Sequence, residues 1–193
     1  MQEDMRNGKK YLNIRSLFII IMAVTLVSAI ICIAYFEGTF LPDWAIWQDM
    51  NIECSETEDG IGLIELKNRR VTVYRNGESV WSTDRDVKVQ KVLYSDVDHD
   101  GENELLILNY KIGRYGFRRP FWDKGLELGW YQHIYIYRYD KAKGRMRPLW
   151  MASDINVDAA DFTIVGDGVV EITDKNNSLT HWAWKDFGLK IIE

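Results

Sequence analysis

A run of residues without a single charge extends from Ser16 to Phe36 and consists mostly of Ile, Leu, Val, Ala and Phe. The hydrocarbon core of a bilayer is about 30 Å thick, and a helix rises about 1.5 Å per residue. A helix over residues 16–36 is therefore long and apolar enough to cross a membrane. This prediction leaves 15 residues before the helix and 157 after it for other structure.

Basic residues are distributed unevenly around this apolar run. Residues 1–15 carry four of them, Arg6, Lys9, Lys10 and Arg15. After the run, no Lys or Arg appears until Lys67. Basic residues in short flanking segments stay on the cytoplasmic side of a membrane. We therefore expect a single-pass protein of the cell membrane, with residues 1–15 as a cytoplasmic tail and the C-terminal part extracytoplasmic.

A cleaved signal peptide is the alternative for this segment. Its apolar core would have about 7–15 residues and would end at a small-x-small cleavage site. The run here is longer, and Cys32-Ile33-Ala34 matches such a site poorly. Ile31 also stands where a bacterial lipoprotein signal has a small residue. We expect an uncleaved signal-anchor.

The charge of the outer part argues against nucleic acid as a partner. Residues 1–15 hold four of the 24 basic and two of the 29 acidic residues, which leaves 20 basic and 27 acidic residues outside. Nucleic-acid binding would need a basic footprint. The cysteines, Cys32 in the apolar run and Cys54 after it, predict no disulfide within the outer part.

An acidic stretch from residue 96 to 104 reads Asp-Val-Asp-His-Asp-Gly-Glu-Asn-Glu. Its oxygen-bearing side chains alternate, and Gly101 permits a sharp turn, so that the oxygens would converge if the backbone curls. The expected ligands are the side chains of Asp96, Asp98, Asp100 and Glu104 and the main-chain carbonyl of Glu102. Calcium takes six to eight oxygens at about 2.3–2.6 Å, so this donor set predicts a Ca²⁺ site. An acidic β-turn without a metal is the alternative.

The loop differs from an EF-hand, which needs a Glu at its twelfth position and a helix on each side. Ile107 occupies the twelfth position, and the flanks, Val87–Leu93 and Leu105–Leu108, are expected to be strands. A strand–loop–strand with this spacing resembles the calcium loop of FG-GAP/VCBS repeats, the blades of integrin-like β-propellers. The resemblance covers about 40 residues and implies a fold unit and a calcium ion, but no reaction.

The residues after the apolar run divide into two parts by pattern. Residues 37–58 contain Pro42, scattered acids and little periodicity, so we expect a stalk or linker with one helical turn around Trp44–Met50. Residues 59–193 are expected to form an extracytoplasmic β domain. Within it, Asn76-Gly77 predicts a two-residue hairpin turn between strands at 70–75 and 78–82, because both positions tolerate positive φ.

Strand patterns recur along this domain. The first unit contains Val73–Arg75, Trp81, the acidic loop and Leu105–Leu108. The second contains Ile136–Arg138, Leu149-Trp150, a short turn at Gly166–Gly168 and Val169–Ile172. A third, partial unit contains Leu179–Trp184 and Leu189–Ile192. A closed propeller needs at least four blades, so we expect a mainly β fold of antiparallel propeller-blade-like meanders, two to three units of an incomplete propeller. Closure with further copies or a partner is the alternative.

A segment rich in aromatic and basic residues, Tyr110–Tyr131, separates the first two units. Aromatic rings pack against sugars, and guanidinium groups bind carboxylates and phosphates. The expected contact residues are Arg114, Tyr115, Phe117, Arg118, Arg119, Phe121 and Trp122. The expected partner is an anionic or sugar-bearing envelope polymer or a membrane protein. The alternative is that the rings pack under the sheet and the arginines pair with local acids.

Recognisable catalytic motifs are absent from the sequence, and each of His99, His133 and His181 is expected to be structural. The sequence therefore predicts a membrane-anchored calcium-binding module that binds or scaffolds at the cell envelope, rather than an enzyme. Two alternatives stay open. One is an extracytoplasmic hydrolase acting on cell-wall glycan, and the other is an accessory subunit of a membrane complex.

Overall fold

The computed structural model describes residues 13–54, 60–115, 125, 127–152 and 154–192. The chain divides into two compact units, residues 1–41 and residues 42–193. The first unit contains helix α1 (Ile14–Phe36), and the second contains the strands.

Helix α1 begins two residues earlier than expected and ends at Phe36, as expected. The side chain of Asn13 caps it by accepting a hydrogen bond from the Arg15 N–H (3.3 Å), as short polar side chains do at helix N-termini. None of its residues is buried. In length and composition α1 suits a membrane span, and a signal sequence near an N-terminus has the same properties. Residues 1–12 of the expected tail lie outside the described residues.

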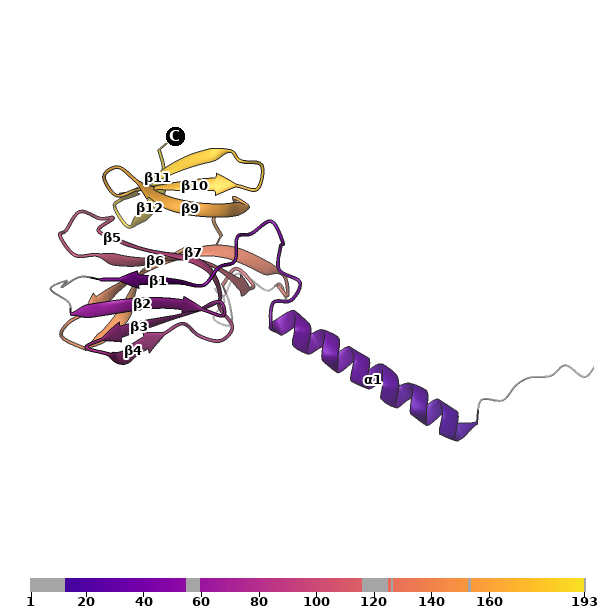
Figure 1. Ribbon diagram of the computed structural model, residues 1–193. Coiled ribbons are helices and arrows are strands. Elements are labelled where there is room, and N and C mark those ends of the chain that lie inside the picture. Colours follow the sequence, from indigo (N-terminus) through magenta and orange to yellow (C-terminus); the bar gives the residue numbers. More distant parts are fainter. Residues whose placement is uncertain (1–12, 55–59, 116–124, 126, 153, 193) are drawn as a thin grey trace, which may run out of the picture. The chain divides into compact units, whose positions relative to one another are not determined.

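The strands of the second unit form three antiparallel four-stranded sheets within the described residues (Figure 1). The first sheet contains β1 (Met50–Glu53), β2 (Ile61–Lys67), β3 (Arg70–Arg75) and β4 (Glu78–Ser82), in that order. The second contains β5 (Lys88–Ser95), β6 (Glu104–Ile112), β7 (Trp130–Asp140) and β8 (Arg145–Met151), also in order. The third contains β9 (Ala159–Val165), β10 (Val169–Asp174), β11 (Leu179–Lys185) and β12 (Gly188–Ile191), again with sequential strands as neighbours.

The second sheet lies between the other two (Figure 1). Side chains alternate between the faces of a strand, and β6 shows this clearly. Leu105 and Ile107 belong to a core shared with the first sheet, whereas Leu106 and Leu108 belong to a core shared with the third. The continuous apolar sequence of β6 is thus explained by burial of both faces.

Buried amides join the second and third sheets. Gln132 donates a hydrogen bond to the Ala159 carbonyl (2.8 Å) and accepts one from the Ala159 N–H (2.8 Å). It also donates to the Gln90 side chain (2.8 Å), which in turn donates to the Ala160 carbonyl (2.6 Å). Because these amides exchange hydrogen bonds with backbone and with each other, their burial is compensated.

The linker is shorter than the sequence predicted. The β unit begins at Pro42, and Met50–Glu53 pairs with β2 as a strand. The segment Trp44–Met50, expected to contain one helical turn, has a turn and a bend at residues 44 and 45 and no helix, and Met50 begins β1. Met50 and Ile52 pack against the first core on alternate positions. The strand was missed because four residues give too short a period-two pattern to stand out from a polar segment.

The predicted hairpin is present. Arg75 pairs with Glu78, and Asn76 and Gly77 form the turn with φ values of 52° and 81°. These left-handed values are the ones a two-residue turn of this kind requires.

The three repeated units occupy equivalent strands. Their first segments lie on the third strand of each sheet, β3, β7 and β11. Trp81 and Trp150 lie on fourth strands, and each packs on the following sheet. Trp81 contacts Tyr137 of β7 with 4.8 Å between ring centroids, and the Trp150 indole lies where a side chain on Gly188 of β12 would be. The first two sequence units therefore each begin in one sheet and end in the next, whereas the third, partial unit lies within the third sheet.

Candidate metal centre

The acidic loop connects β5 to β6, and the pairing of Ser95 with Glu104 closes it. Both flanks are strands, as the sequence predicted. Two residues of the loop, His99 (φ 61°) and Gly101 (φ 91°), adopt left-handed backbone conformations. Glycine adopts this region without strain, which explains its place at the sharpest part of the turn.

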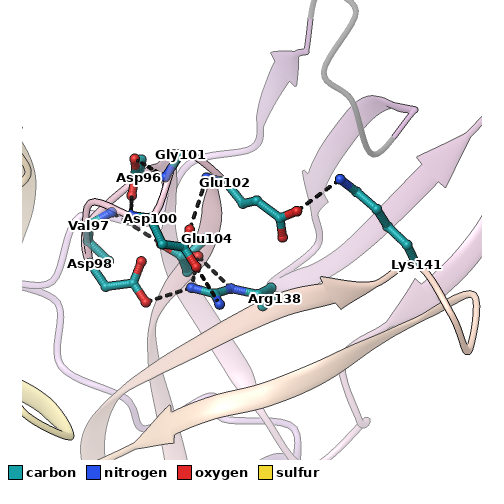
Figure 2. Close-up of polar contacts among 9 residues, drawn as sticks. All are labelled: Asp96, Val97, Asp98, Asp100, Gly101, Glu102, Glu104, Arg138 and Lys141. Atoms are coloured by element: carbon teal, nitrogen blue, oxygen red, sulfur yellow. Dashed lines mark hydrogen bonds and ion pairs between the residues drawn. The ribbon is translucent and has the colours of Figure 1, made fainter.

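Hydrogen bonds from the backbone curl the loop around Asp96. The Asp96 carboxylate accepts the N–H groups of Asp100 (3.2 Å) and Gly101 (2.9 Å). Asp100 in turn accepts the Glu102 N–H (3.0 Å). Short acidic side chains commonly stabilise turns in this way. The curl brings one carboxylate oxygen each of Asp96, Asp98 and Glu104 near one another, and Figure 2 shows the loop that carries them.

Arg138 of β7 contacts three of these carboxylates (Figure 2). Its guanidinium nitrogens lie 2.6 Å from Asp98, 2.7 Å from Asp100 and 2.8 Å from Glu104. Leu105 pairs with Tyr137, so strand register places Arg138 beside Glu104. Arg138 is not among the residues that the sequence predicts for this site.

The five predicted ligands are placed differently from one another. One oxygen from each of Asp96, Asp98 and Glu104 lies within 4.8 Å of the other two. These three oxygens are close enough for one metal ion to contact all of them. Asp100 faces Arg138, and the Glu102 side chain pairs with Lys141 at 2.9 Å. A contribution from Glu102 would therefore come from its carbonyl, which stays a prediction.

Negative charge exceeds positive charge at the centre. With all four carboxylates of Asp96, Asp98, Asp100 and Glu104 ionised, and Arg138 as their cation, the net charge is −3. Glu104 is fully buried, and the Oδ1 atom of Asp98 is buried without a hydrogen-bond partner among the described residues. Buried acceptors of this kind are normally satisfied. The donor set therefore fits a further hard cation.

Burial raises the pKa of Glu104 to about 7, although hydrogen bonds from Arg138 and from the Val97 N–H act in the opposite direction. Burial would lower the pKa of Arg138, but its hydrogen bonds and charge interactions with Glu104 and Asp98 outweigh this and raise it. Arg138 thus stays cationic, while Glu104 exchanges a proton near neutral pH.

This raised pKa predicts a pH-dependent stability for the calcium-free protein. Glu104 ordinarily titrates near pH 4.5 and, when folded, near 7, so the folded state holds the proton more tightly between these values. The resulting stabilisation is complete below 4.5 and is lost as the pH rises through about 7. Glu104→Gln should remove this component. Melting temperatures measured in chelator between about pH 5 and 8 should fall more steeply with rising pH for the wild type than for Glu104→Gln. Equal pH dependence of the two proteins would contradict the raised pKa of Glu104.

His99 projects toward the third sheet. Its Cε1 atom lies only 2.9 Å from the position of a Cβ atom built on Gly168. Gly168 belongs to the turn between β9 and β10, the counterpart of the acidic loop in the second unit. The absence of a side chain there leaves room for the imidazole.

Two residues of the predicted contact surface are described. Arg114 lies near Glu127 (3.7 Å) and Asp154 (3.5 Å), as the alternative of pairing with local acids predicted. Tyr115 is 41% exposed. Tyr110 is buried in β6, 5.7 Å from the Trp47 ring. The remaining predicted contact residues lie outside the described residues: Phe117, Arg118, Arg119, Phe121 and Trp122.

The other histidines are held by structural contacts. His133 is buried, its Nδ1 lies 2.9 Å from the Ala152 carbonyl, and burial lowers its pKa. His181 lies 3.0 Å from Glu171. Over the described ranges, Asp96, Asp98 and Glu104 are the group of possible ligands close enough to share a metal.

Comparison with protein-family models, with curated proteins and with solved structures gave no match to this chain. The resemblance to FG-GAP/VCBS repeats therefore depends on the loop spacing quoted above.

Proposed function

We propose that the protein is a single-pass, membrane-anchored, extracytoplasmic calcium-binding β module that binds or scaffolds at the cell envelope. The observation that carries the proposal is the convergence of Asp96, Asp98 and Glu104 oxygens within 4.8 Å. The three carboxylates would bind Ca²⁺, with Asp100 and the Glu102 carbonyl completing its shell.

Calcium suits this centre better than magnesium. Magnesium requires a near-ideal octahedron with ligands at about 2.0–2.1 Å and keeps several waters, whereas calcium accepts more carboxylates in irregular geometry. Arg138 already shares the carboxylates, so calcium binding would have to compete with it. Extracellular modules bind calcium with dissociation constants of about 10⁻⁴–10⁻³ M, and such a modest affinity is compatible with this competition.

The blade-like character of the sheets is part of the proposal. Each sheet is an antiparallel meander of four sequential strands, and β5 of the second sheet contacts β9 of the third. Propeller blades are four-stranded sheets of this kind. The calcium loop would stabilise the turn between the first two strands of the second blade.

The anchor and its orientation complete the proposal. Helix α1 has the length of a membrane span, and Arg15 stands at its N-terminal end. Basic residues on that side favour a cytoplasmic N-terminus. The β unit would then meet extracellular calcium and envelope polymers or membrane proteins.

Protease protection in intact cells tests location and calcium binding together. With an epitope at each end of the full-length chain, external protease should remove the C-terminal epitope and leave a membrane-bound N-terminal stub. Calcium in the medium should slow this digestion and chelator should hasten it, because a ligand of the folded state reduces unfolding. The Asp98→Asn variant should be digested at the same rate in calcium as in chelator.

Orientation, retention of α1 and calcium binding would each be contradicted by a different result. A protected C-terminal epitope in intact cells would reverse the orientation. A mature chain without α1 would show a cleaved signal sequence. If the wild type were digested at the same rate in calcium and in chelator, the loop would be an acidic turn that binds no calcium.

A further inference from the structure

We infer that a cleft beside the start of β7 binds a neutral sugar unit of an envelope glycan, an inference that rests on the proposed extracytoplasmic location. The cleft has a volume of about 350 Å³, at the lower end of the range of small-molecule sites. Its lining combines aromatic rings with polar side chains, among them Trp44, Trp130, Tyr131, Asp154, Asn156 and Asp158.

Contacts with neighbouring residues position Tyr131 and Asp154 of the cleft. The guanidinium of Arg114 lies over the Tyr131 ring, 5.1 Å from its centroid. The same guanidinium lies 3.5 Å from the Asp154 carboxylate, so one residue positions a ring and an acid of the cleft. A Cβ atom on Gly129 would lie 3.4 Å from the Tyr131 ring. Side chains positioned in this way lose less conformational entropy on binding than free ones do.

The acids of the cleft are already partly neutralised. Asp158 pairs with Lys175 at 2.6 Å, and Asp154 accepts the Asn156 N–H at 2.9 Å in addition to its contact with Arg114. Among the described residues, no Lys or Arg lines the cleft. Anionic ligands are therefore disfavoured, and paired acids attract cations less strongly than free ones.

Neutral sugars match this combination. The C–H groups on one face of a sugar ring pack against the face of an aromatic ring, which also contributes apolar area. The hydroxyl groups at the ring edge donate to carboxylates and exchange hydrogen bonds with an amide, the groups that Asp154, Asp158 and Asn156 present. Gln132, which also lines the cleft, is engaged with Gln90 and Ala159.

Binding to the full-length chain in nanodiscs tests the inference. Chitotriose, cellotriose and maltotriose would be titrated by calorimetry, with polygalacturonate and choline as anionic and cationic comparisons. We expect at least one of the neutral trisaccharides to bind. Trp130→Ala should weaken it by about tenfold, the usual size of a loss at an aromatic contact. Asn156→Gly should also weaken it without strain, because Asn156 has a φ of 52°.

Phe187→Ala provides the control, because it removes an aromatic ring that is 88% exposed in the β11–β12 turn, away from the cleft. It should leave binding unchanged. The inference would be overturned if none of the three trisaccharides binds, if polygalacturonate or choline binds more tightly than they do, or if Asn156→Gly binds as well as the wild type. The calcium-dependent melting shift of the same samples separates the two proposals. If the shift is present without sugar binding, only the cleft assignment is wrong.

Discussion

Without calcium, Arg138→Met should be far less stable than the wild type, and calcium should restore much of the loss. The substitution keeps a long side chain but removes the cation shared by Asp98, Asp100 and Glu104. Removing one partner of a buried ion pair costs about 3–5 kcal/mol, because the remaining charge is left uncompensated. Protonation of Glu104, whose pKa is about 7, should reduce this cost at acidic pH. Chemical denaturation in chelator and in calcium would measure both effects.

Lys141→Met is the matched control for this experiment. It removes a basic residue that pairs with Glu102 of the same loop, but both side chains are more than a third exposed. An exposed pair contributes about 0–1 kcal/mol, so we expect little change in stability and none in the response to calcium. If Arg138→Met were as stable as Lys141→Met in chelator, the guanidinium would not be neutralising the centre. If calcium failed to rescue Arg138→Met, the carboxylates would not form a calcium site.

The second large effect is the response of the wild type to calcium. A ligand that binds only the folded state stabilises it by about 2.7 kcal/mol at a hundredfold excess over its dissociation constant. The melting temperature of the wild type should therefore rise in calcium and fall again in chelator. Asp98→Asn should abolish the rise, because Asp98 is one of the three converging residues and one of its oxygens is buried without a hydrogen-bond partner among the described residues.

Asp167→Asn is the control for Asp98→Asn. Asp167 lies in the turn between β9 and β10, which corresponds to the acidic loop but holds one acid between two glycines. It should respond to calcium as the wild type does. An unchanged melting temperature of the wild type in calcium would contradict the proposed metal, whatever the variants do.

Local sequence pattern was sufficient to predict several parts of the fold. The apolar helix, the Asn76-Gly77 hairpin and the strand–loop–strand around Gly101 each depend on neighbouring residues, whose periodicity and φ requirements are visible in the sequence. The repeated units also correspond to equivalent strands, although their boundaries do not coincide with those of the sheets.

The missing parts depend on contacts between residues distant in sequence. Met50–Glu53 becomes a strand because β2 offers it an edge to pair with, and four residues carry little pattern of their own. Arg138 is separated from Glu104 by 34 positions, and strand register brings the two together. The repeat offers one signal for Arg138. Val73-Tyr74-Arg75 and Ile136-Tyr137-Arg138 both end in Tyr-Arg, so Arg138 stands at an equivalent position of the repeat.

The offset between sequence units and sheets has a consequence for cooperativity. The first unit supplies β3 and β4 to one sheet and β6 to the next, and the second unit supplies β7, β8 and β10 in the same way. In solenoids, each repeat is a complete structural element, and stability grows by roughly independent increments along the array. Here the removal of either of these two units would leave two sheets incomplete and expose both cores. The β unit should therefore unfold in a single transition, and it should tolerate insertions in its turns better than the loss or gain of a repeat.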